Sequence, residues 1–371
     1  MPMKILVLMK RFGVKKDMVL SRFGRQHNLF HNLARKGHKI DFVCFDYVKF
    51  DRFDLKKGGL AFHVRPYYII NHFTSMSFLK NMVKNNNYDW IVSSTDPLIG
   101  VIGYGLSRNF KINHIYEMQD DYSLYSSIKI PFVKSKDLEV VKNSEIVVTV
   151  SDSLREKIRK LRVKPTFTIQ NGVDIGSFRT KNKEYCRKLL KLPAGKIIIY
   201  TGEISKFKGI GMLLKAFSRV RKYAPDSYLL LSGPIHDINV KQENVIYREY
   251  PKRWEVIHAM NAADVGVIPN PVNEFSKYCY PYKMAEYMAC GLQIVSTDVG
   301  DAGRLLSKYP GSICKPDDEK DMADKIIGKL KLTKKVNYDK VLKNLTWENL
   351  GNKLDKILRA KYLLKTSHSI R

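Results

Sequence analysis

Short apolar runs alternate with amphipathic stretches along most of the chain. Runs rich in Val, Ile, Leu and Phe occupy residues 4–9, 39–45, 90–94, 114–118 and 145–150. The stretch 25–38, between two of these runs, has apolar residues at helical spacing. Nearly continuous apolar strands that alternate with helices are typical of a parallel sheet covered on both faces. The first part of the chain is therefore predicted to be α/β.

The alternation pauses once and then restarts. After the run at 166–171 comes a mostly polar segment, and apolar runs return at 197–202, 227–233, 244–249, 264–269 and 291–297. The simplest account is two doubly wound, Rossmann-like domains, which we place at residues 1–166 and 167–345. Residues 347–364 have an apolar face at helical spacing. The last part of the chain, 346–371, is therefore predicted to be a C-terminal helix.

Length and composition agree with two domains. A chain of 371 residues exceeds the size at which a single hydrophobic core keeps growing, and 44% of its residues are hydrophobic. The five cysteines lack the spacing of a zinc site or a disulfide framework, so we expect reduced, mostly buried thiols in a cytoplasmic protein. No apolar run approaches the roughly 20 residues that span a bilayer, and the N-terminus lacks the pattern of a signal peptide.

Positive charge is the largest compositional feature, with a formal net charge of +29. Residues 1–166 contain 29 basic and 15 acidic side chains, and the rest contains 36 and 21, so the excess extends over the whole chain. Such a field attracts polyanions, namely nucleic acid, an anionic membrane leaflet or phosphorylated small molecules. A general effect on solubility is the alternative.

The segment Tyr278–Gly300 contains a proline, a lysine, a glutamate and a glycine that a helix packed in a core would not need. Pro281 suits the first turn of a helix, and Gly291 suits the position after its end. The free amides and positive dipole end of such a helix favour a phosphate, and Lys283 adds a formal charge beside it. Glu286, one turn further on, could accept hydrogen bonds from the two hydroxyls of a ribose. A capped surface helix with an ordinary charged face would explain the same residues.

Residues 200–217 form a second segment of this kind. A strand is followed by Gly202, then by Lys206 and Lys208, and then by a helix. The glycine lets backbone approach a ligand closely, and the ammonium group of Lys208 can reach a diphosphate. Another strand ends at Gly233. Because ligands bind outside the carboxyl ends of parallel strands, we expect these residues to share one ligand site.

The order of these motifs resembles the nucleotide-sugar glycosyltransferases of the GT-B fold, specifically the large retaining group classed as family 4. The resemblance covers nearly the whole chain, and "PYKMAEYMACGLQIVSTDVG" is its most specific piece. It implies two Rossmann-like domains that face a cleft and a C-terminal helix that packs back on the first domain. It also implies an enzyme that moves a hexosyl group from a UDP- or GDP-sugar to a glycan or lipid-linked acceptor, without a cofactor.

The resemblance also implies donor-binding residues. By this likeness Lys208 would hold the donor diphosphate and Glu286 the donor ribose. Together with the strand-end residues already described, the full predicted donor set is Gly202, Lys206, Lys208, Gly233, Tyr280, Pro281, Tyr282, Lys283 and Glu286.

In the first domain, "YEMQDDY" is similar to a family segment that ends in an acid facing the cleft, which matches Asp120. The predicted catalytic residues are therefore Asp120, Lys208 and Glu286. Ser94, Thr95 and Asp96, at another strand end, and Gln119, before the acid, are predicted to lie on the acceptor side. Gly13 and Gly24, which flank a basic loop, are placed on the same side and suggest a mobile segment over the cleft. Capped turns, and glycines that serve packing alone, are the alternatives for this set.

Three positions depart from the family pattern. Glu203 stands where many relatives have an arginine, and Lys206 would then take over as a phosphate partner. Tyr278 stands where relatives often have a glutamate that contacts the sugar, which leaves the identity of the sugar open. Gln119 replaces a histidine or arginine before the acid. A subset of the family with the same "PxKxxEYMA" pattern carries the second and third changes.

Metal-using transferases usually show Asp-x-Asp, which does not occur in this sequence. The positive end of the helix after Pro281, with Lys208 and Lys283, would stabilise the leaving diphosphate instead. We therefore expect no metal ligands and metal-independent transfer. Retention of the anomeric configuration rests on the resemblance.

One stretch suits peripheral binding to an anionic leaflet because basic and apolar side chains alternate in it. Core packing of an ordinary helix is the alternative. The residues are Arg22, Phe23, Arg25, Leu29, Phe30, Arg35 and Lys36.

Two other functions stay open, a GT-B sugar-nucleotide epimerase that binds the same donor and a noncatalytic scaffold of the glycosyltransferase type. No nucleic-acid partner is expected, because the lysines and glycines lie at strand ends and do not form a basic and aromatic stripe. A Rossmann dehydrogenase is also disfavoured, because no GxGxxG follows the first strand.

Overall fold

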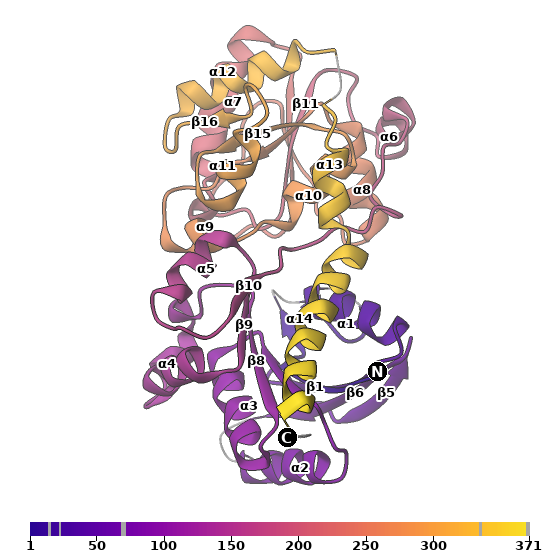
Figure 1. The fold of residues 1–371 in the computed structure, drawn as a ribbon. Coiled ribbons are helices and arrows are strands. Elements are labelled where there is room, and N and C mark those ends of the chain that lie inside the picture. The colour runs from indigo at the N-terminus through magenta and orange to yellow at the C-terminus, as the bar shows by residue number, and fades with distance from the viewer. Residues whose placement is uncertain (14–15, 22–23, 68–71, 334–335, 369–371) are drawn as a thin grey trace. The chain divides into compact units, whose positions relative to one another are not determined.

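The computed structural model describes residues 1–13, 16–21, 24–67, 72–333 and 336–368. The chain forms two compact α/β units (Figure 1). The first unit consists of residues 1–170 and 347–371, and the second consists of residues 171–346. The sequence alone places the boundaries after residues 166 and 345.

An eight-stranded sheet forms the centre of the first unit, in the order β10-β9-β8-β7-β1-β4-β6-β5. All neighbouring strands are parallel except β5 and β6, which are antiparallel. The strands are β1 (Lys4–Lys10), β4 (Lys39–Asp46), β5 (Phe53–Lys57), β6 (Leu60–Pro66), β7 (Trp90–Ser94), β8 (Asn113–Met118), β9 (Ile146–Thr149) and β10 (Thr166–Thr168). The central strands are buried on both faces, which explains their continuous apolar sequences.

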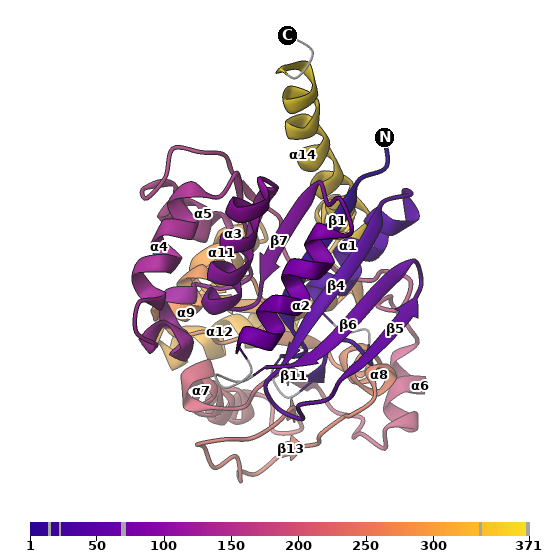
Figure 2. The same ribbon diagram turned by 90° about the horizontal axis from the view of Figure 1, so that it is seen from below.

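Helices cover both faces of this sheet. On one face α2 and α3 lie over the strands (Figure 2). Leu79 of α2 and Ile99 of α3 belong there to a buried cluster with strand residues such as Leu8. On the other face Phe30 of α1 meets the ring of Phe42 edge-on, with ring centroids 5.7 Å apart. The remaining elements are α1 (Arg25–Arg35), α2 (His72–Lys84), α3 (Pro97–Phe110), α4 (Val133–Asn143), α5 (Asp152–Arg159), the short hairpin of β2 (Phe12–Gly13) and β3 (Lys16–Asp17), and the 3-10 turns η2 (Tyr122–Leu124) and η3 (Ser126–Lys129).

The C-terminal helix α14 (Trp347–His368) belongs to the first unit, where it packs on α1. Gly351 permits the close approach, because a Cβ at this position would lie 2.6 Å from the Cβ of Asn32. Oδ1 of Asp355 lies 2.9 Å from Nε2 of His38, which fixes the helix further to the rest of the unit. The same oxygen lies 2.8 Å from Nε of Arg359 on α14. The first unit is thus built from both ends of the chain.

The second unit contains a six-stranded, fully parallel sheet in the order β13-β12-β11-β14-β15-β16. Its strands are β11 (Ile197–Thr201), β12 (Tyr228–Ser232), β13 (Val245–Tyr247), β14 (Val265–Ile268), β15 (Gln293–Thr297) and β16 (Ile313–Cys314). Its helices are α6 (Lys183–Leu189), α7 (Ile210–Tyr223), α8 (Arg253–Ala262), α9 (Glu274–Tyr278), α10 (Tyr282–Ala289), α11 (Gly300–Leu306), α12 (Glu319–Leu330) and α13 (Asp339–Leu345), with the 3-10 turn η4 (Lys206–Lys208). The prediction of two doubly wound α/β halves is confirmed.

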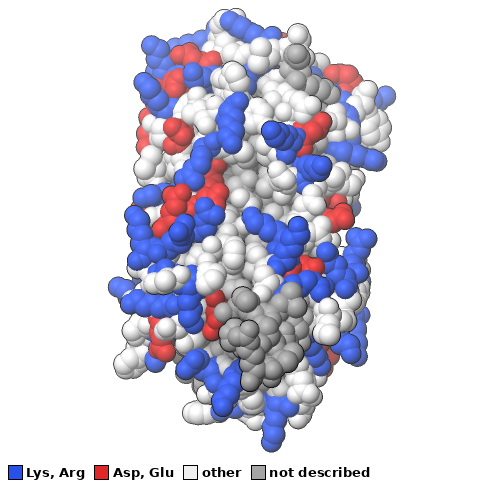
Figure 3. Space-filling model, in the orientation of Figure 1, with Lys and Arg blue, Asp and Glu red and all other residues white. Residues whose placement is uncertain are grey.

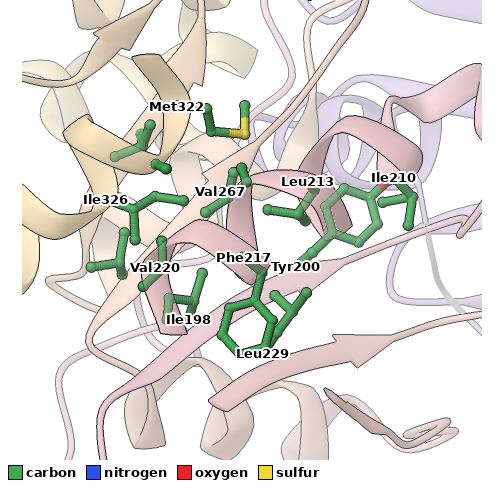
Figure 4. Close-up of a cluster of buried hydrophobic side chains, with 14 of the residues drawn as sticks. Ile198, Tyr200, Ile210, Leu213, Phe217, Val220, Leu229, Val267, Met322 and Ile326 are labelled. Carbon is green, nitrogen blue, oxygen red and sulfur yellow. The ribbon is translucent and has the colours of Figure 1, made fainter. Parts of the chain in front are cut away.

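The core of the second unit lies between its sheet and the pair α7 and α12. Phe217 of α7 and Ile326 of α12 pack with Ile198, Leu229 and Val267 of the strands (Figure 4). These side chains are at most 1% exposed. All five cysteines of the chain are buried and unpaired, as expected. This close packing fixes the strand ends from which the candidate site is built.

The expectation that the stretch at α1 offers its apolar residues to a membrane was wrong for Leu29 and Phe30, and Arg25 is buried with them. Arg25, Leu29 and Phe30 are each at most 1% exposed, because this face of α1 packs on the sheet. Arg35 and Lys36 are exposed, whereas Arg22 and Phe23 lie outside the described residues. Lys and Arg side chains are instead scattered over the face of the molecule in Figure 3. In the described part of the chain, no helix has the length and apolar composition needed to cross a bilayer.

Candidate functional site

Two glycines at neighbouring strand ends of the second unit hold the backbone in conformations that other residues rarely adopt. Gly202 follows β11 with φ +127°, and Gly233 follows β12 with φ +138°. The amide of Gly202 donates to the carbonyl of Ser232 at 2.8 Å. A Cβ on Gly233 would overlap the carbonyl oxygen of Gly202. The two predicted donor glycines are therefore in direct backbone contact.

Lys283 lies beside the first of these glycines. Its Nζ is 3.8 Å from the centroid of the Tyr200 ring, and a Cβ on Gly202 would come within 3.0 Å of it. The Tyr200 hydroxyl donates to the carbonyl of Glu203 at 2.7 Å, which ties the ring to the loop after β11. The fully buried Tyr200 ring thus holds the Lys283 ammonium group by a cation–π interaction.

Lys208 also lies over an aromatic ring. It ends the turn η4, and its Nζ is 3.7 Å from the centroid of the Phe275 ring on α9. Gly209 follows with φ +76° and has no room for a Cβ against the carbonyl of Pro269. Lys206 lies at the start of the same turn, where its amide donates to Asp237 at 2.9 Å and its side chain is exposed. Of the two lysines, Lys208 is the one held against α9.

Helix α10 brings the remaining predicted donor residues to the same place. It begins at Tyr282 with Pro281 as its N-cap, one residue later than the sequence suggested, and Gly291 follows its end with φ +73°. The carbonyl of Tyr280 accepts a hydrogen bond from the buried side chain of Asn171 at 2.7 Å. Tyr287, on the inner face of the helix, accepts from the amide of Thr201 at 3.0 Å. Asn171 therefore fixes the chain just before α10, and Tyr287 fixes the second half of the helix to the end of β11.

Charged residues around Lys283 change its pKa. Burial and, to a smaller extent, the positive charge of Lys208 lower the pKa of Lys283 to about 7, and Cys279, Glu286 and Glu203 act in the opposite direction. The charges of Lys208 and Glu286 thus both influence the Lys283 ammonium group, which itself lies beside Gly202. A buried ammonium group with a second cation nearby favours an anionic ligand.

In the first unit, Ser94 and Gln119 belong to a buried polar network that the sequence did not reveal. Ser94 donates to the carboxylate of Glu117. The side-chain amide of Gln26 donates to Ser94 at 2.8 Å, to Glu117 at 3.0 Å and to Gln119 at 3.2 Å. Arg25 forms an ion pair with Glu117 and donates to the carbonyl of Gln170 at 2.7 Å. The network fixes the ends of β7 and β8 against the start of α1.

Thr95 and Asp96 follow β7 and have structural partners. Thr95 has φ +75°, which is rare for a residue branched at Cβ, and its hydroxyl accepts from the amide of Lys10 at 2.8 Å. Asp96 caps α3 by accepting from the amide of Leu98 at 2.8 Å, and it also forms an ion pair with Lys10. The helix-cap alternative thus describes Asp96. The strained backbone at Thr95 is of the kind that functional sites retain.

Asp120 and its neighbour Asp121 differ in their roles. Asp121 caps η2 through the amide of Ser123 at 3.2 Å and binds Nζ of Lys157 at 2.6 Å. Asp120 is partly exposed and accepts from the hydroxyl of Tyr125 at 2.9 Å. Asp121, and not Asp120, therefore caps this turn. This leaves the Asp120 carboxylate at the rim of the β8 strand end.

Gly13 and Gly24 share one neighbour, Met18. A Cβ on Gly13 would lie 3.2 Å from the Met18 sulfur, and one on Gly24, which has φ +106°, would lie 3.6 Å from it. Met18 is 7% exposed. The structure gives both glycines a packing role, and their predicted place on the acceptor side stays a prediction.

Two cavities lie elsewhere. A cavity of about 370 Å³ in the second unit is lined by Lys196, Asp264 and Gln293, at the opposite ends of the strands. An open groove of about 870 Å³ in the first unit is lined by residues such as Lys39, Lys56 and Arg65. The chemically distinctive side chains cluster at the carboxyl ends of the strands, where open parallel sheets bind their ligands, so we place the candidate site there.

Comparison with known proteins assigns the chain to a family. Residues 26–177 match the model described as Glycosyltransferase Family 4, and residues 195–331 match the model described as Glycosyl transferases group 1. Together the two matches cover more than three quarters of the chain. The chain belongs to glycosyltransferase family 4. The family predicted from the motif order is thereby confirmed.

Curated relatives of this family 4 chain are distant. A Bacillus subtilis glycosyltransferase named for teichuronic acid biosynthesis, TuaH, is 23% identical over 197 residues, which are 50% of this chain and 49% of TuaH. The D-inositol 3-phosphate glycosyltransferase of an Arthrobacter species is 29% identical over 150 residues, which are 36% of this chain and 34% of that protein. The chain spans about half the length of TuaH.

Solved structures similar to the family 4 chain have the GT-B fold. Sucrose-phosphate synthase from Thermosynechococcus elongatus matches with a TM-score of 0.73 and 16% identity, over 98% of this chain and 100% of that one. The Anabaena protein HepE, solved with UDP and glucose, matches with a TM-score of 0.71 and 16% identity, over 96% and 99%. The predicted GT-B fold is confirmed.

Proposed function

We propose that this family 4 chain transfers a sugar from a nucleoside diphosphate donor to a hydroxyl group of a glycan or lipid-linked acceptor. The observation that carries the proposal is the placement of the Lys283 ammonium group, on the first turn of α10, against Gly202 and within the field of Lys208 and Glu286. This arrangement suits a diphosphate together with a ribose. The relatives named as glycosyltransferases, and the UDP and glucose bound by HepE, support the same donor class.

In this proposal the second unit stabilises the leaving group. When the bond between the anomeric carbon and the diphosphate oxygen breaks, negative charge accumulates on the diphosphate. The ammonium groups of Lys208 and Lys283 and the free amides at the start of α10 are placed to neutralise that charge, and each such group typically contributes a few kcal/mol to transition-state stabilisation. Glu286 would accept hydrogen bonds from the ribose hydroxyls and so orient the nucleotide.

The acceptor oxygen then bonds to the anomeric carbon on the face that the diphosphate leaves. Its proton passes to the departing phosphate oxygen, so charge and atoms balance and the configuration is retained. Asp120, held by Tyr125, would orient the acceptor hydroxyl or stabilise the positive charge on the sugar. Glu203 and Tyr278, the residues that depart from the family pattern, would tune the choice of sugar.

Product analysis with radiolabelled UDP- and GDP-sugars tests transfer directly. We expect a labelled glycan or lipid product with the donor's anomeric configuration, and an unchanged rate after treatment with EDTA. Activity that EDTA abolishes and magnesium restores would contradict the metal-independent mechanism. Conversion of the donor sugar to an epimer without any acceptor would favour the epimerase, and binding without turnover would favour the scaffold.

Binding of UDP or GDP is expected to take up a proton above neutral pH. Because the pKa of Lys283 is about 7, this lysine is largely neutral at about pH 8, and a bound diphosphate would restore its charge. At about pH 6 the lysine is already charged, so little uptake is expected. Calorimetry in buffers with different ionisation enthalpies measures the uptake.

Lys283→Arg is the matched control for this measurement. Arginine keeps its positive charge throughout the accessible pH range, so uptake at about pH 8 should disappear in this variant. Equal uptake by the variant and the native protein would contradict the assignment to Lys283.

A further inference from the structure

The segment between η2 and α4 in the first unit exposes apolar side chains that the core does not use. Leu124 is 49% exposed, Ile130 42%, Phe132 82% and Leu138 39%. We refer to these four residues, with the lysines among them, as the 124–138 surface. Single exposed apolar residues are common, but four within one short segment form a candidate interaction surface.

Phe132 is the centre of this surface, and its conformation has no explanation in the fold. Its φ of +64° lies in the left-handed region, where a bulky aromatic residue is strained. The turn around it is nevertheless well ordered, because the carbonyl of Phe132 accepts from the amide of Lys136 at 3.0 Å and from the hydroxyl of Ser135 at 3.0 Å. Val133, the next residue, is buried and anchors the turn. The chain thus holds a large aromatic ring in water at the tip of α4.

The charges around Phe132 are predominantly basic. Lys129 and Lys134 flank the tip and are exposed. Leu138 lies one helical turn from Lys134 on one side and from Lys142 on the other. Between residues 124 and 142, all of which the structure describes, the acids are Asp137, which is buried, and Glu139, which pairs with Lys136 at 2.9 Å.

We infer that the 124–138 surface docks the protein on an anionic membrane surface. Apolar side chains at a rigid tip can enter the boundary between headgroups and acyl chains, and the lysines around them can meet lipid phosphates. This surface differs from the basic face of α1 that the sequence suggested, because the apolar residues of α1 are buried.

The same segment connects the docking tip with the predicted acceptor-side residues. Within this segment, Tyr125 donates to the Asp120 carboxylate at 2.9 Å, and Ser127 donates to Asp96 at 3.0 Å. A lipid-linked acceptor in the membrane would therefore be presented next to Asp96 and Asp120. This part of the inference rests on the proposed function, whereas the docking itself does not.

Vesicle flotation of the full chain tests the docking. The probes are vesicles of phosphatidylcholine alone and vesicles in which about a third of the lipid is phosphatidylglycerol. We expect binding to the anionic vesicles that weakens with salt. Phe132→Asn should reduce the partition coefficient by about tenfold, because the variant loses the aromatic ring that would be buried in the membrane. Asparagine tolerates a positive φ, so the variant should fold at least as well as the native chain.

Two further variants identify the source of any effect. The pair Lys134→Gln and Lys142→Gln should also reduce binding by about tenfold at low salt and have little effect at high salt. Tyr223→Asn, at a residue 58% exposed in the second unit, is the matched control and should bind like the native protein. Equal loss in Phe132→Asn and Tyr223→Asn, native binding by Phe132→Asn, or no binding to anionic vesicles would each overturn the inference. The last result would point to a protein partner.

A transfer assay with a water-soluble acceptor separates this inference from the proposed function. Phe132→Asn should transfer sugar to that acceptor at the native rate, because the variant loses only the contact with lipid. Vesicle binding that depends on Phe132, in a protein without transferase activity, would support the docking and contradict the proposed function. Transfer to the soluble acceptor without vesicle binding would support the proposed function and contradict the docking.

Discussion

Replacement of Lys208 by methionine is expected to lower kcat/KM for sugar transfer by about 100- to 1,000-fold. Methionine keeps much of the apolar stem, so its contact with the Phe275 ring can persist while the ammonium group is lost. The lost charge acts on the diphosphate as the glycosidic bond breaks, so the loss should fall mainly on kcat. Steady-state kinetics with saturating acceptor measure both parameters.

Lys215→Met is the matched control for this variant, because Lys215 is exposed on α7, the helix that follows Lys208. It should retain native kinetics. Phe275→Leu should fall between the two, since Lys208 keeps its charge but loses the ring that holds it 3.7 Å away. A loss of less than tenfold in Lys208→Met would contradict the proposed role in stabilising the leaving group.

Replacement of Arg25 by methionine is expected to destabilise the first unit by about 3–5 kcal/mol. Arg25 is fully buried and forms an ion pair with Glu117, which is 4% exposed. Without the guanidinium group the carboxylate stays buried and keeps only neutral donors, Ser94 and Gln26. Urea unfolding, monitored by the hydrogen exchange of amides in β8, measures the free energy of unfolding of the first unit.

Arg35→Met on the same helix controls for the loss of a positive charge, because Arg35 is exposed. Its effect should stay within about 0.5 kcal/mol. The double variant Arg25→Met with Glu117→Gln should be less destabilised than Arg25→Met alone, since the unpaired charge is removed. Similar losses in Arg25→Met and Arg35→Met would show that the buried pair does not stabilise this unit.

The apolar strands were the most predictable part of the fold. The run at 4–9 corresponds to β1, Lys4–Lys10, and the run at 291–297 contains β15, Gln293–Thr297. These strands lie inside parallel sheets with both faces covered, so burial imposes a continuous apolar sequence. The antiparallel edge strand β5 was missed because its sequence, FDLKK, is mostly exposed. Its signal was the turn at Gly58 and Gly59, both with positive φ, which is typical of a two-residue hairpin.

In the candidate site, charged residues near glycines were predictable and their aromatic partners were not. Lys208 and Lys283 could be selected because each lies beside a strand end or a helix start. Tyr200 and Phe275, whose rings contact these lysines, come from other elements. Each ring comes close to its lysine only when the sheet has folded. For Arg25, a local signal did exist. It lies four residues before Leu29, so helical spacing places it on the apolar face of α1.

The backbone contact between Gly202 and Gly233 restricts how this protein can diversify. A methyl group at Gly233 would collide with the neighbouring loop, and both residues adopt backbone angles that disfavour any side chain. Adaptation to a new donor therefore cannot proceed through these two positions, although they line the candidate site. Evolution or engineering would have to act on positions that already carry side chains, such as Glu203, which follows Gly202.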